Sequence, residues 1–291
     1  MKACLICPAE RPAVSALAQI APLANLPLLG KSLLEYWLEH LASLGATQVQ
    51  VLAADRPDLA RAVVGNGARW GFISAEVSEE MRELPPLLAR AKYPILQTVE
   101  WLPEPFDMVS MTHFPGQPEH PLFASYADWF AALFAWLPHA ATLNRIGVRE
   151  VQPGVWAGMR SHIAPSAQLR GPCWIGEGSR VGPRSVIGPK AIVEDYALIE
   201  SDCQVTDAVI GPQTLVGKLA EVKDSFAWGG TLINWKTGSI TTSPDPFFVC
   251  ALGHPFSPRK TESWRRQLAA VYARNKEELQ LLWDQSKIKL P

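Results

Sequence analysis

Aliphatic residues recur every six positions between residues 163 and 222. In nine of the steps a small residue follows the aliphatic residue four positions later, and in five steps glycine follows it directly. The aliphatic positions are Ile163, Leu169, Ile175, Val181, Ile187, Val193, Ile199 and Val205, then, after one five-residue step, Ile210, Val216 and Val222. This hexapeptide pattern predicts a parallel β-helix.

In such a fold each hexad forms one short strand and one tight corner, and three hexads close one coil. The aliphatic side chain points inward, the small residue fits near the crowded corner, and glycine or proline eases the turn. One coil cannot bury its own face, so stability comes from stacked neighbours. A sandwich of alternating strands would need a period of two. Left-handed winding is implied by resemblance to hexapeptide-repeat proteins.

In the first eighty residues, apolar strands alternate with amphipathic helices. Strands are expected at 2–7, 48–53 and 72–77, and helices at 32–44 and around 57–64. Strand–helix–strand order indicates parallel pairing with right-handed crossovers. This part is therefore predicted to be an α/β domain.

Proline is dense between residues 85 and 121, where no periodicity is evident. Apolar helices are expected at 126–137 and 263–285. The second of these either packs within the chain or forms a contact between copies. We expect three parts: an α/β domain over 1–145, the β-helix over 146–242, and a linker with a C-terminal helix over 243–291.

Composition places the chain among globular proteins, with 48% hydrophobic and 19% charged residues and a formal net charge of -1. That charge argues against a general nucleic-acid binder. No apolar run approaches the ~20 residues of a membrane span, and the N-terminus lacks the layout of a signal peptide. Five cysteines, an odd number, fit a reducing compartment. We expect a cytoplasmic protein without membrane contact, with Cys4 and Cys7 packed in the core.

Three short motifs accompany these elements: LPLLGKSLLEY at 26–36, GNGARWG at 65–71 and TLINWKTG at 231–238. The order of these motifs, followed by the hexads, resembles that in the sugar-nucleotide pyrophosphorylases. These enzymes join a sugar 1-phosphate to a nucleoside triphosphate. The resemblance covers roughly residues 1–80 and 145–250. It implies a truncated Rossmann-like nucleotidyltransferase domain, followed by a left-handed parallel β-helix and a C-terminal helix.

The phosphate-binding groups of that family are missing at the matching positions. Ala9 and Arg11 stand where the loop would carry glycine, Ala13 replaces its arginine, and Leu23 replaces its lysine. A metal-binding aspartate at a later strand end is also not found. The nearest strand candidate, 93–99, carries no acid, and Asp107 is expected in a proline-rich loop. Ordinary pyrophosphorylase activity is therefore not expected.

Four functions remain open at this point. The main hypothesis is a degenerate nucleotidyltransferase, a pseudoenzyme with a binding, scaffold or regulatory role in nucleotide-sugar or polysaccharide metabolism. The first alternative is an active sugar-1-phosphate nucleotidyltransferase with an altered site. The second is a hexapeptide-repeat acyltransferase, although the repeats contain no histidine, and His162 and His254 flank them. The last is a structural module.

No catalytic residue or metal ligand is predicted. Arg11 and Lys31 are the candidate substrate-binding residues. Arg11 is a cation close to the expected phosphate loop, and Lys31 matches the family's Gly-Lys position. No cofactor is expected, and Mg²⁺ would enter only with an active nucleotidyltransferase. Expected partners are a nucleotide-sugar or sugar phosphate and further copies of the chain, since β-helix edges invite association; no nucleic acid is expected.

Overall fold

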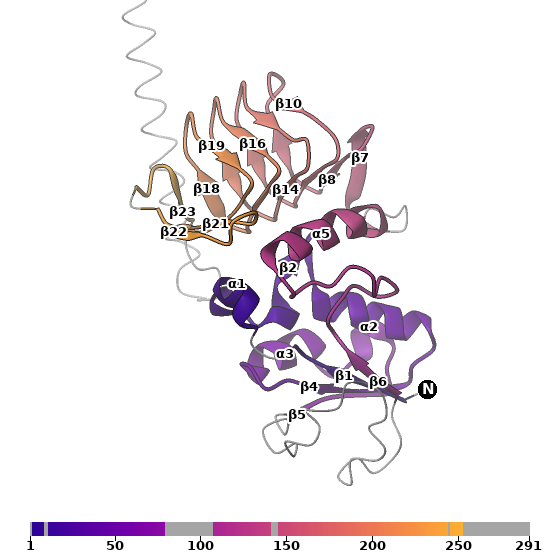
Figure 1. Ribbon diagram of the computed structural model, residues 1–291. Helices are drawn as coiled ribbons and strands as arrows, with labels where there is room; N and C mark the ends of the chain where they lie inside the picture. Colours follow the sequence, from indigo (N-terminus) through magenta and orange to yellow (C-terminus); the bar gives the residue numbers. More distant parts are fainter. Residues whose placement is uncertain (1, 9–10, 79–106, 141–144, 244, 253–291) are drawn as a thin grey trace, which may run out of the picture. The chain divides into compact units, whose positions relative to one another are not determined.

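The structure is a computed structural model that describes residues 2–8, 11–78, 107–140, 145–243 and 245–252 (Figure 1). Contacts group Met1–Cys250 in one compact unit and Ala251–Pro291 in a second. The expected strand at 93–99 and the expected helix at 263–285 lie outside the described residues. The domain boundaries at 145 and 242 stay predictions.

The N-terminal part is built on a four-stranded parallel sheet with the order β5-β4-β1-β6. Its strands are β1 (Lys2–Ile6), β4 (Gln48–Leu52), β5 (Ser74–Ser78) and β6 (Asp107–Ser110). The parallel α/β arrangement expected from the sequence is thus confirmed. That this part is a nucleotidyltransferase domain is not confirmed.

Strand β6 corrects one expectation. Asp107 does not lie in a loop: it opens β6 and pairs with Ala3 of β1 in parallel register. The strand escapes a sequence pattern because it is short and lies at the sheet edge, after a proline-rich segment. Its carboxyl end is Ser110, so no acid lies where the family resemblance would require a metal ligand.

Helix α2 (Leu33–Ser43) begins at a capping box. The Ser32 Oγ accepts a hydrogen bond from the Glu35 backbone nitrogen at 3.2 Å, and the Glu35 carboxylate accepts one from the Ser32 nitrogen at 2.9 Å. Both groups would otherwise lack partners at the helix start. The remaining helices and short elements of this part are η1 (Pro12–Val14), α1 (Ser15–Ile20), η2 (Leu23–Asn25), β2 (Pro27–Leu28), β3 (Lys31–Ser32), α3 (Pro57–Val64), η3 (Ala68–Trp70) and α5 (Tyr126–Ala140).

The predicted packing of the C-x-x-C pair is confirmed. Cys4 and Cys7 are buried free thiols on β1 and directly after it. Burial raises the pKa of Cys4 to about 11 and that of Cys7 to about 12. Both thiols therefore stay protonated at neutral pH.

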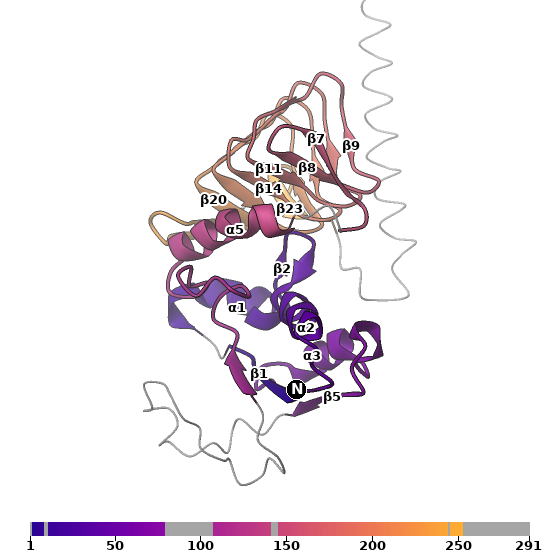
Figure 2. The same cartoon turned by 90° about the vertical axis from the view of Figure 1, so that its right-hand side faces the viewer.

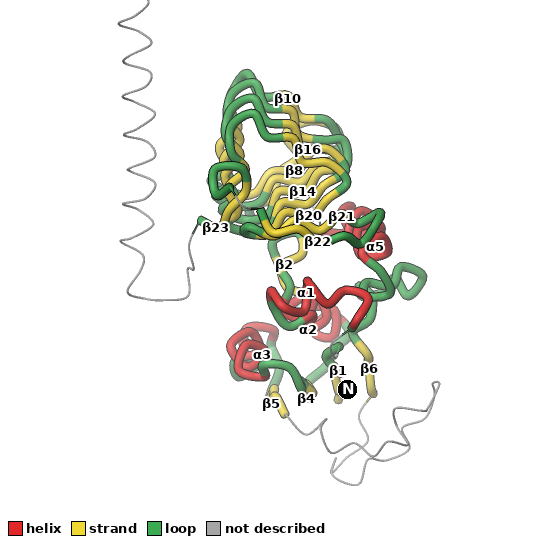
Figure 3. The backbone as a smooth tube through the Cα atoms, turned by 60° about the vertical axis from the view of Figure 1, so that its left-hand side comes forward, coloured by secondary structure: helices red, strands yellow, loops and turns green. Residues whose placement is uncertain are grey.

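Strands β8 to β20 pair in parallel and form a β-helix, as the hexads predict, and β7, β21 and β22 extend one of its faces by antiparallel pairing. Cys173 pairs with Ala191, eighteen residues further on, and Ala191 pairs with Ala208, seventeen residues further on. The shorter offset is the five-residue step of the sequence. Figure 3 shows the strands of one face stacked side by side. The strands are β7 (Val148–Gln152), β8 (Val155–Gly158), β9 (His162–Ile163), β10 (Gln168–Leu169), β11 (Cys173–Ile175), β12 (Arg180–Val181), β13 (Val186–Ile187), β14 (Ala191–Val193), β15 (Leu198–Ile199), β16 (Gln204–Thr206), β17 (Ala208–Ile210), β18 (Thr214–Val216), β19 (Glu221–Lys223), β20 (Ser225–Trp228), β21 (Thr231–Asn234), β22 (Ile240–Thr242) and β23 (Val249–Ala251).

Serines in the small-residue slots add polar contacts inside the coil stack. The Ser179 Oγ donates to the Glu194 carbonyl and the Ser185 Oγ donates to the Glu200 carbonyl, each at 2.7 Å. Both serines are fully buried. These bonds satisfy hydroxyls that would be costly to bury alone.

One face of the β-helix is covered by the N-terminal part of the same unit. The outward side chains of β8, β11, β14, β17 and β20 are apolar and join the core of the α/β part: Trp156, Trp174, Ile192, Val209 and Phe226. Helix α5 lies along this face (Figures 1 and 2), where the Trp129 and Phe226 rings meet with centroids 4.6 Å apart. In the described part of the chain, no helix has the length and apolar character that a membrane crossing requires.

Candidate functional site

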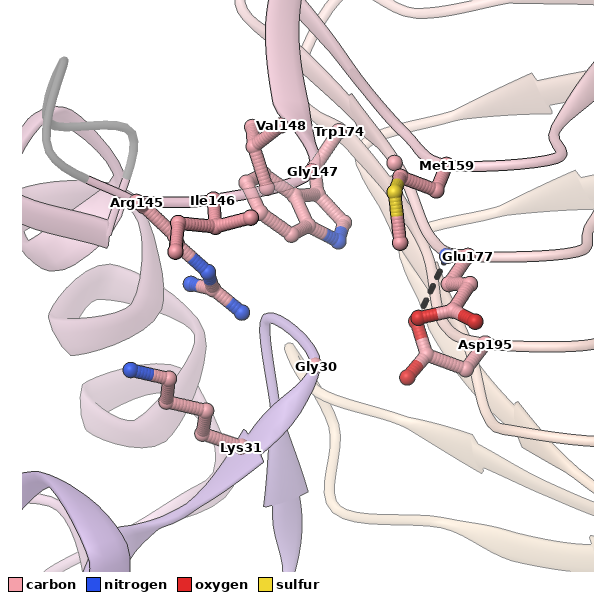
Figure 4. A pocket seen from close by; sticks show the side chains of 11 residues that line it. Gly30, Lys31, Arg145, Ile146, Gly147, Val148, Met159, Trp174, Glu177 and Asp195 are labelled. Carbon is pink, nitrogen blue, oxygen red and sulfur yellow. Dashed lines mark hydrogen bonds between the residues drawn. The ribbon is translucent and has the colours of Figure 1, made fainter.

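A cavity of about 380 Å³ lies where three segments of the Met1–Cys250 unit meet (Figure 4). These are the β2–β3 turn, the residues that follow α5, and the first corners of the β-helix. The cavity is lined by Gly30, Lys31, Arg145, Ile146, Gly147, Val148, Gly158, Met159, Trp174, Glu177 and Asp195.

The turn between β2 and β3 forms one wall. Leu29 and Gly30 both have positive φ, 55° and 75°, as the two central residues of a type I′ hairpin turn must. A Cβ at residue 30 would lie 2.9 Å from the Arg145 Nη2 and 3.4 Å from the Asp195 Oδ1. Glycine is therefore needed here both for its φ and for the close approach of a cation and a carboxylate.

Asp195 is the acid on the opposite side of the lining, at a corner after β14. Its Oδ1 accepts a hydrogen bond from the Glu177 backbone nitrogen at 2.7 Å (Figure 4). Partial burial, and then the Glu177 carboxylate, raise the pKa of Asp195, while that backbone bond and Arg145 oppose the shift. A carboxylate with a raised pKa is a stronger proton acceptor.

Glu194 stands behind Asp195 and is fully buried. Its carboxylate accepts hydrogen bonds from the backbone nitrogens of Leu29 and Gly30 at 2.5 and 2.9 Å. Burial raises the pKa of Glu194 to about 7, and Asp195 adds to the rise. The two turn amides and Arg145 act in the other direction.

Arg145 supplies a positive charge to the cavity, in addition to Lys31. Its guanidinium donates to the Leu29 carbonyl at 2.5 Å, to the Ala140 carbonyl at 3.0 Å and to the Tyr36 hydroxyl at 3.2 Å. The guanidinium also lies 4.9 Å from the ring centroid of Trp174, a cation–π contact. Arg145 thus holds the turn and one aromatic wall together.

The Trp174 side chain is 1% exposed, and its indole Nε1 has no hydrogen-bond partner among the described residues. A buried donor left without a partner costs roughly 1–3 kcal/mol. Trp174 lines the cavity (Figure 4), but its Nε1 exposes less than 1 Å², so a ligand acceptor atom would reach this N–H only once the indole turns toward the cavity. The cavity therefore combines a proton acceptor, Asp195, with an unused donor, Trp174.

The structure does not bring the two predicted substrate-binding residues to one cavity. Lys31 lines the cavity just described, with its Nζ paired to Glu39 at 2.6 Å. Arg11 is exposed at the start of η1. It lines neither this cavity nor a second one of about 420 Å³ between Pro12, Ser125 and Trp235. Their role in binding stays a prediction.

Among the residues that the structure describes, no histidine lines this cavity. His162, one of the two histidines that flank the repeats, is exposed on β9 and is not part of the lining. His254 lies outside the described residues. Within the described ranges, no group of three or more His, Cys, Asp or Glu side chains is arranged to hold a metal ion.

Two sequence signals of this site were not used in the predictions. Glu194 occupies the position directly after the inward aliphatic, where the neighbouring coils have Gly176 and Gly211. A charged residue in a glycine slot is a weak signal, because Glu200 occupies the same slot after Ile199 and its carboxylate contacts the next coil, at Lys218. The outward apolar positions, Trp156 and Trp174 among them, recur at the coil spacing and mark the covered face.

No family model matches the chain, and no curated protein matches it. Among solved structures, two mutants of a perosamine N-acetyltransferase from Caulobacter crescentus, each in complex with CoA and GDP-perosamine, are similar to it. They share 12% and 11% identity, with TM-scores of 0.18 and 0.14. Each comparison covers 83% of this chain and 97% of the other.

These findings correct the main functional hypothesis. Both structures are acetyltransferases and neither is a nucleotidyltransferase, so the comparison does not bear out the main hypothesis. The pseudoenzyme and nucleotidyltransferase descriptions are therefore withdrawn. The structure also argues against the first alternative, an active nucleotidyltransferase, because β6 ends at Ser110 without an acid and Lys31 is paired with Glu39. TM-scores this low carry no argument about the reaction of this chain.

Proposed function

We propose that the chain is an acyltransferase that moves an acyl group from a thioester to an amine in the cavity at Gly30, Trp174 and Asp195. The observation that carries this proposal is the pairing, in one cavity, of a carboxylate with a raised pKa and a buried N–H donor without a partner. Acyl transfer needs both a proton acceptor and a donor for the developing oxyanion.

In the proposed step the amine nitrogen attacks the thioester carbonyl carbon. Asp195 accepts the proton that the amine loses, the Trp174 Nε1–H donates to the carbonyl oxygen as it becomes negative, and the C–N bond forms. The C–S bond then breaks, and the leaving thiolate takes up the proton from Asp195. An amide and a free thiol are the products.

An amine acceptor suits the charges around the cavity. Glu177 and Asp195 line the side of the cavity across from Lys31 and Arg145 (Figure 4), and their carboxylates attract an ammonium group on that side. The volume of about 380 Å³ accommodates a compact acceptor group rather than a large molecule. CoA thioesters and amino sugars, free or nucleotide-linked, are the reagents to try first, because the two similar structures contain CoA and GDP-perosamine.

The test incubates the purified full chain with acetyl-CoA and a panel of free and nucleotide-linked amino sugars, and follows thiol release and product mass. We expect amine-dependent thiol release that falls at least 100-fold in Asp195→Asn. Asp202→Asn is the matched control, because Asp202 is a corner aspartate paired with Arg184 outside the cavity. Release that no amine stimulates, or that Asp195→Asn leaves unchanged, would overturn the proposal.

Association of several copies belongs to this proposal as well. The cavity opens at β-helix corners, and a β-helix has edges that favour pairing unless they are covered. Light scattering of the full chain gives its mass in solution. A monomer at every concentration would remove this part of the proposal and leave the reaction to its own test.

A further inference from the structure

The turn at Leu29 and Gly30 is held in place by groups outside its own hairpin. Leu29 has a φ of 55°, a left-handed conformation that costs a non-glycine residue roughly 1–2 kcal/mol. Leucine offers no polar side chain to ease that strain. Surrounding contacts must therefore stabilise the turn.

The β-helix supplies the main contact through Glu194. One carboxylate oxygen accepts from the Leu29 nitrogen at 2.5 Å, and the other accepts from the Gly30 nitrogen at 2.9 Å. On the other side, Arg145 donates to the Leu29 carbonyl at 2.5 Å. Both amides of the turn and one of its carbonyls thus depend on residues more than one hundred positions away.

Glu194 does not line the cavity, but the turn that it holds does. Gly30 and Lys31 form one wall, and Asp195 follows Glu194 directly in the chain. If the turn loses its hydrogen bonds to Glu194 and separates from it, this wall moves away from Asp195. The distance between the two sides of the cavity therefore depends on a residue that a ligand in the cavity does not contact.

We propose that Glu194 is a positioning residue, whose carboxyl docks the Leu29–Gly30 turn on the β-helix and so fixes the wall of the cavity opposite Asp195. The docking follows from the contacts alone, whereas its consequence for catalysis rests on the proposed acyl transfer. The charged and titratable groups that face Glu194 are Arg145, Asp195 and Tyr36.

The docked state has a distinctive dependence on pH. Burial in the docked state raises the pKa of Glu194 to about 7. A turn that has left would expose the carboxyl to water, where its pKa returns to the ordinary value near 4.5. The docked state thus holds the proton more tightly, and raising the pH from about 4.5 to about 7 favours release of the turn.

Hydrogen exchange of the full chain, followed on peptides that cover residues 26–32, tests the docking. We expect at least tenfold faster exchange in Glu194→Ala, and a smaller change in Glu194→Gln, which keeps one acceptor. After correction for intrinsic exchange, protection in the unmodified chain should fall between about pH 5 and pH 7 and level off above that. Glu194→Gln should remove this pH step, and Glu200→Gln should leave it in place.

Glu200 is a matched control because it also follows an inward aliphatic at a coil corner, where it accepts from the Lys218 nitrogen at 2.8 Å. Unchanged protection in Glu194→Ala, or a pH step that survives in Glu194→Gln, would overturn the docking. Glu194→Gln keeps the side chain's size, so a failure of Glu194→Ala to fold does not prevent the test.

Kinetics separate this inference from the proposed function. With acyl transfer established, Glu194→Ala should raise the KM for the amine at least tenfold and change kcat less, while Asp195→Asn should mainly lower kcat. A released turn with an unchanged KM would overturn the positioning role. Absence of any acyl transfer would overturn the proposed function, while the exchange experiment would still decide the docking.

Discussion

Asp195 lies one coil further along the β-helix than Gly176, and the two residues are in direct contact. A Cβ at residue 176 would lie 2.5 Å from both the backbone nitrogen and the Oδ1 of Asp195, closer than real atoms approach. The position of the Asp195 carboxylate, and with it the width of the cavity, therefore depends on the missing side chain at residue 176.

Gly176→Ala should consequently displace Asp195 and reduce acyl transfer at least tenfold, with a loss of roughly 1–3 kcal/mol in the free energy of unfolding. Gly182→Ala is the control, since a Cβ there would lie 2.6 Å from the Glu200 carbonyl carbon, away from the cavity. Urea denaturation and thiol release measure the two effects. Equal activity losses in both variants would contradict a specific role for Gly176.

Replacing Trp174 with phenylalanine keeps an aromatic ring beside Arg145 and removes the indole N–H. Because that buried donor has no partner within the described residues, we expect a change of at most about 1 kcal/mol in stability. Acyl transfer should fall by roughly 100-fold if the N–H stabilises the oxyanion.

Trp129→Phe tests the specificity of that effect. Trp129 is also fully buried, and its Nε1 has no partner in the part of the chain that the structure describes, but its ring packs on Phe226 away from the cavity. Steady-state kinetics and thermal unfolding are measured for both variants. A loss of activity in Trp129→Phe as large as that in Trp174→Phe would show that packing, not hydrogen bonding, is responsible.

The pH dependence of stability should carry the signature of Glu194. Its folded pKa is about 7 and its ordinary value is 4.5, so between these pH values the folded state binds a proton that the unfolded state lacks. Stability therefore decreases as the pH rises from about 4.5 to 7, by roughly 3 kcal/mol at most.

Glu194→Gln should flatten this part of the profile, measured by urea denaturation at a series of pH values. The remaining slope reports Asp195, whose pKa is raised in the same direction. An identical pH profile for Glu194→Gln and the unmodified chain would mean that Glu194 does not titrate near neutrality.

Ser185→Ala should destabilise the β-helix without touching the cavity. Its Oγ donates to the Glu200 carbonyl at 2.7 Å and accepts from the Cys203 nitrogen at 3.1 Å. Loss of both bonds inside the coil stack should cost about 1–3 kcal/mol, seen as a lower urea midpoint. Thr237→Ala, at an exposed turn, should have little effect; a similar loss there would point to a general weakness of the chain.

Periodicity made the β-helix predictable, because each coil repeats one rule and only the step between Val205 and Ile210 departs from it. Strand β6 was not predictable in the same way, since four residues at a sheet edge carry too little pattern. The cavity was harder still. The contact between Gly30 and Glu194 joins positions 164 residues apart, and no local pattern encodes such a distance. Glu194 stands in a glycine slot, but so does Glu200, and the sequence does not tell the two apart.

The apolar stripe of Trp156, Trp174, Ile192, Val209 and Phe226 limits how this chain can be divided. A solenoid excised on its own would present five large hydrophobic side chains in a row to water, a surface that promotes aggregation. Shuffling this β-helix onto another protein would therefore require polar replacements along that row, or a new partner of similar shape.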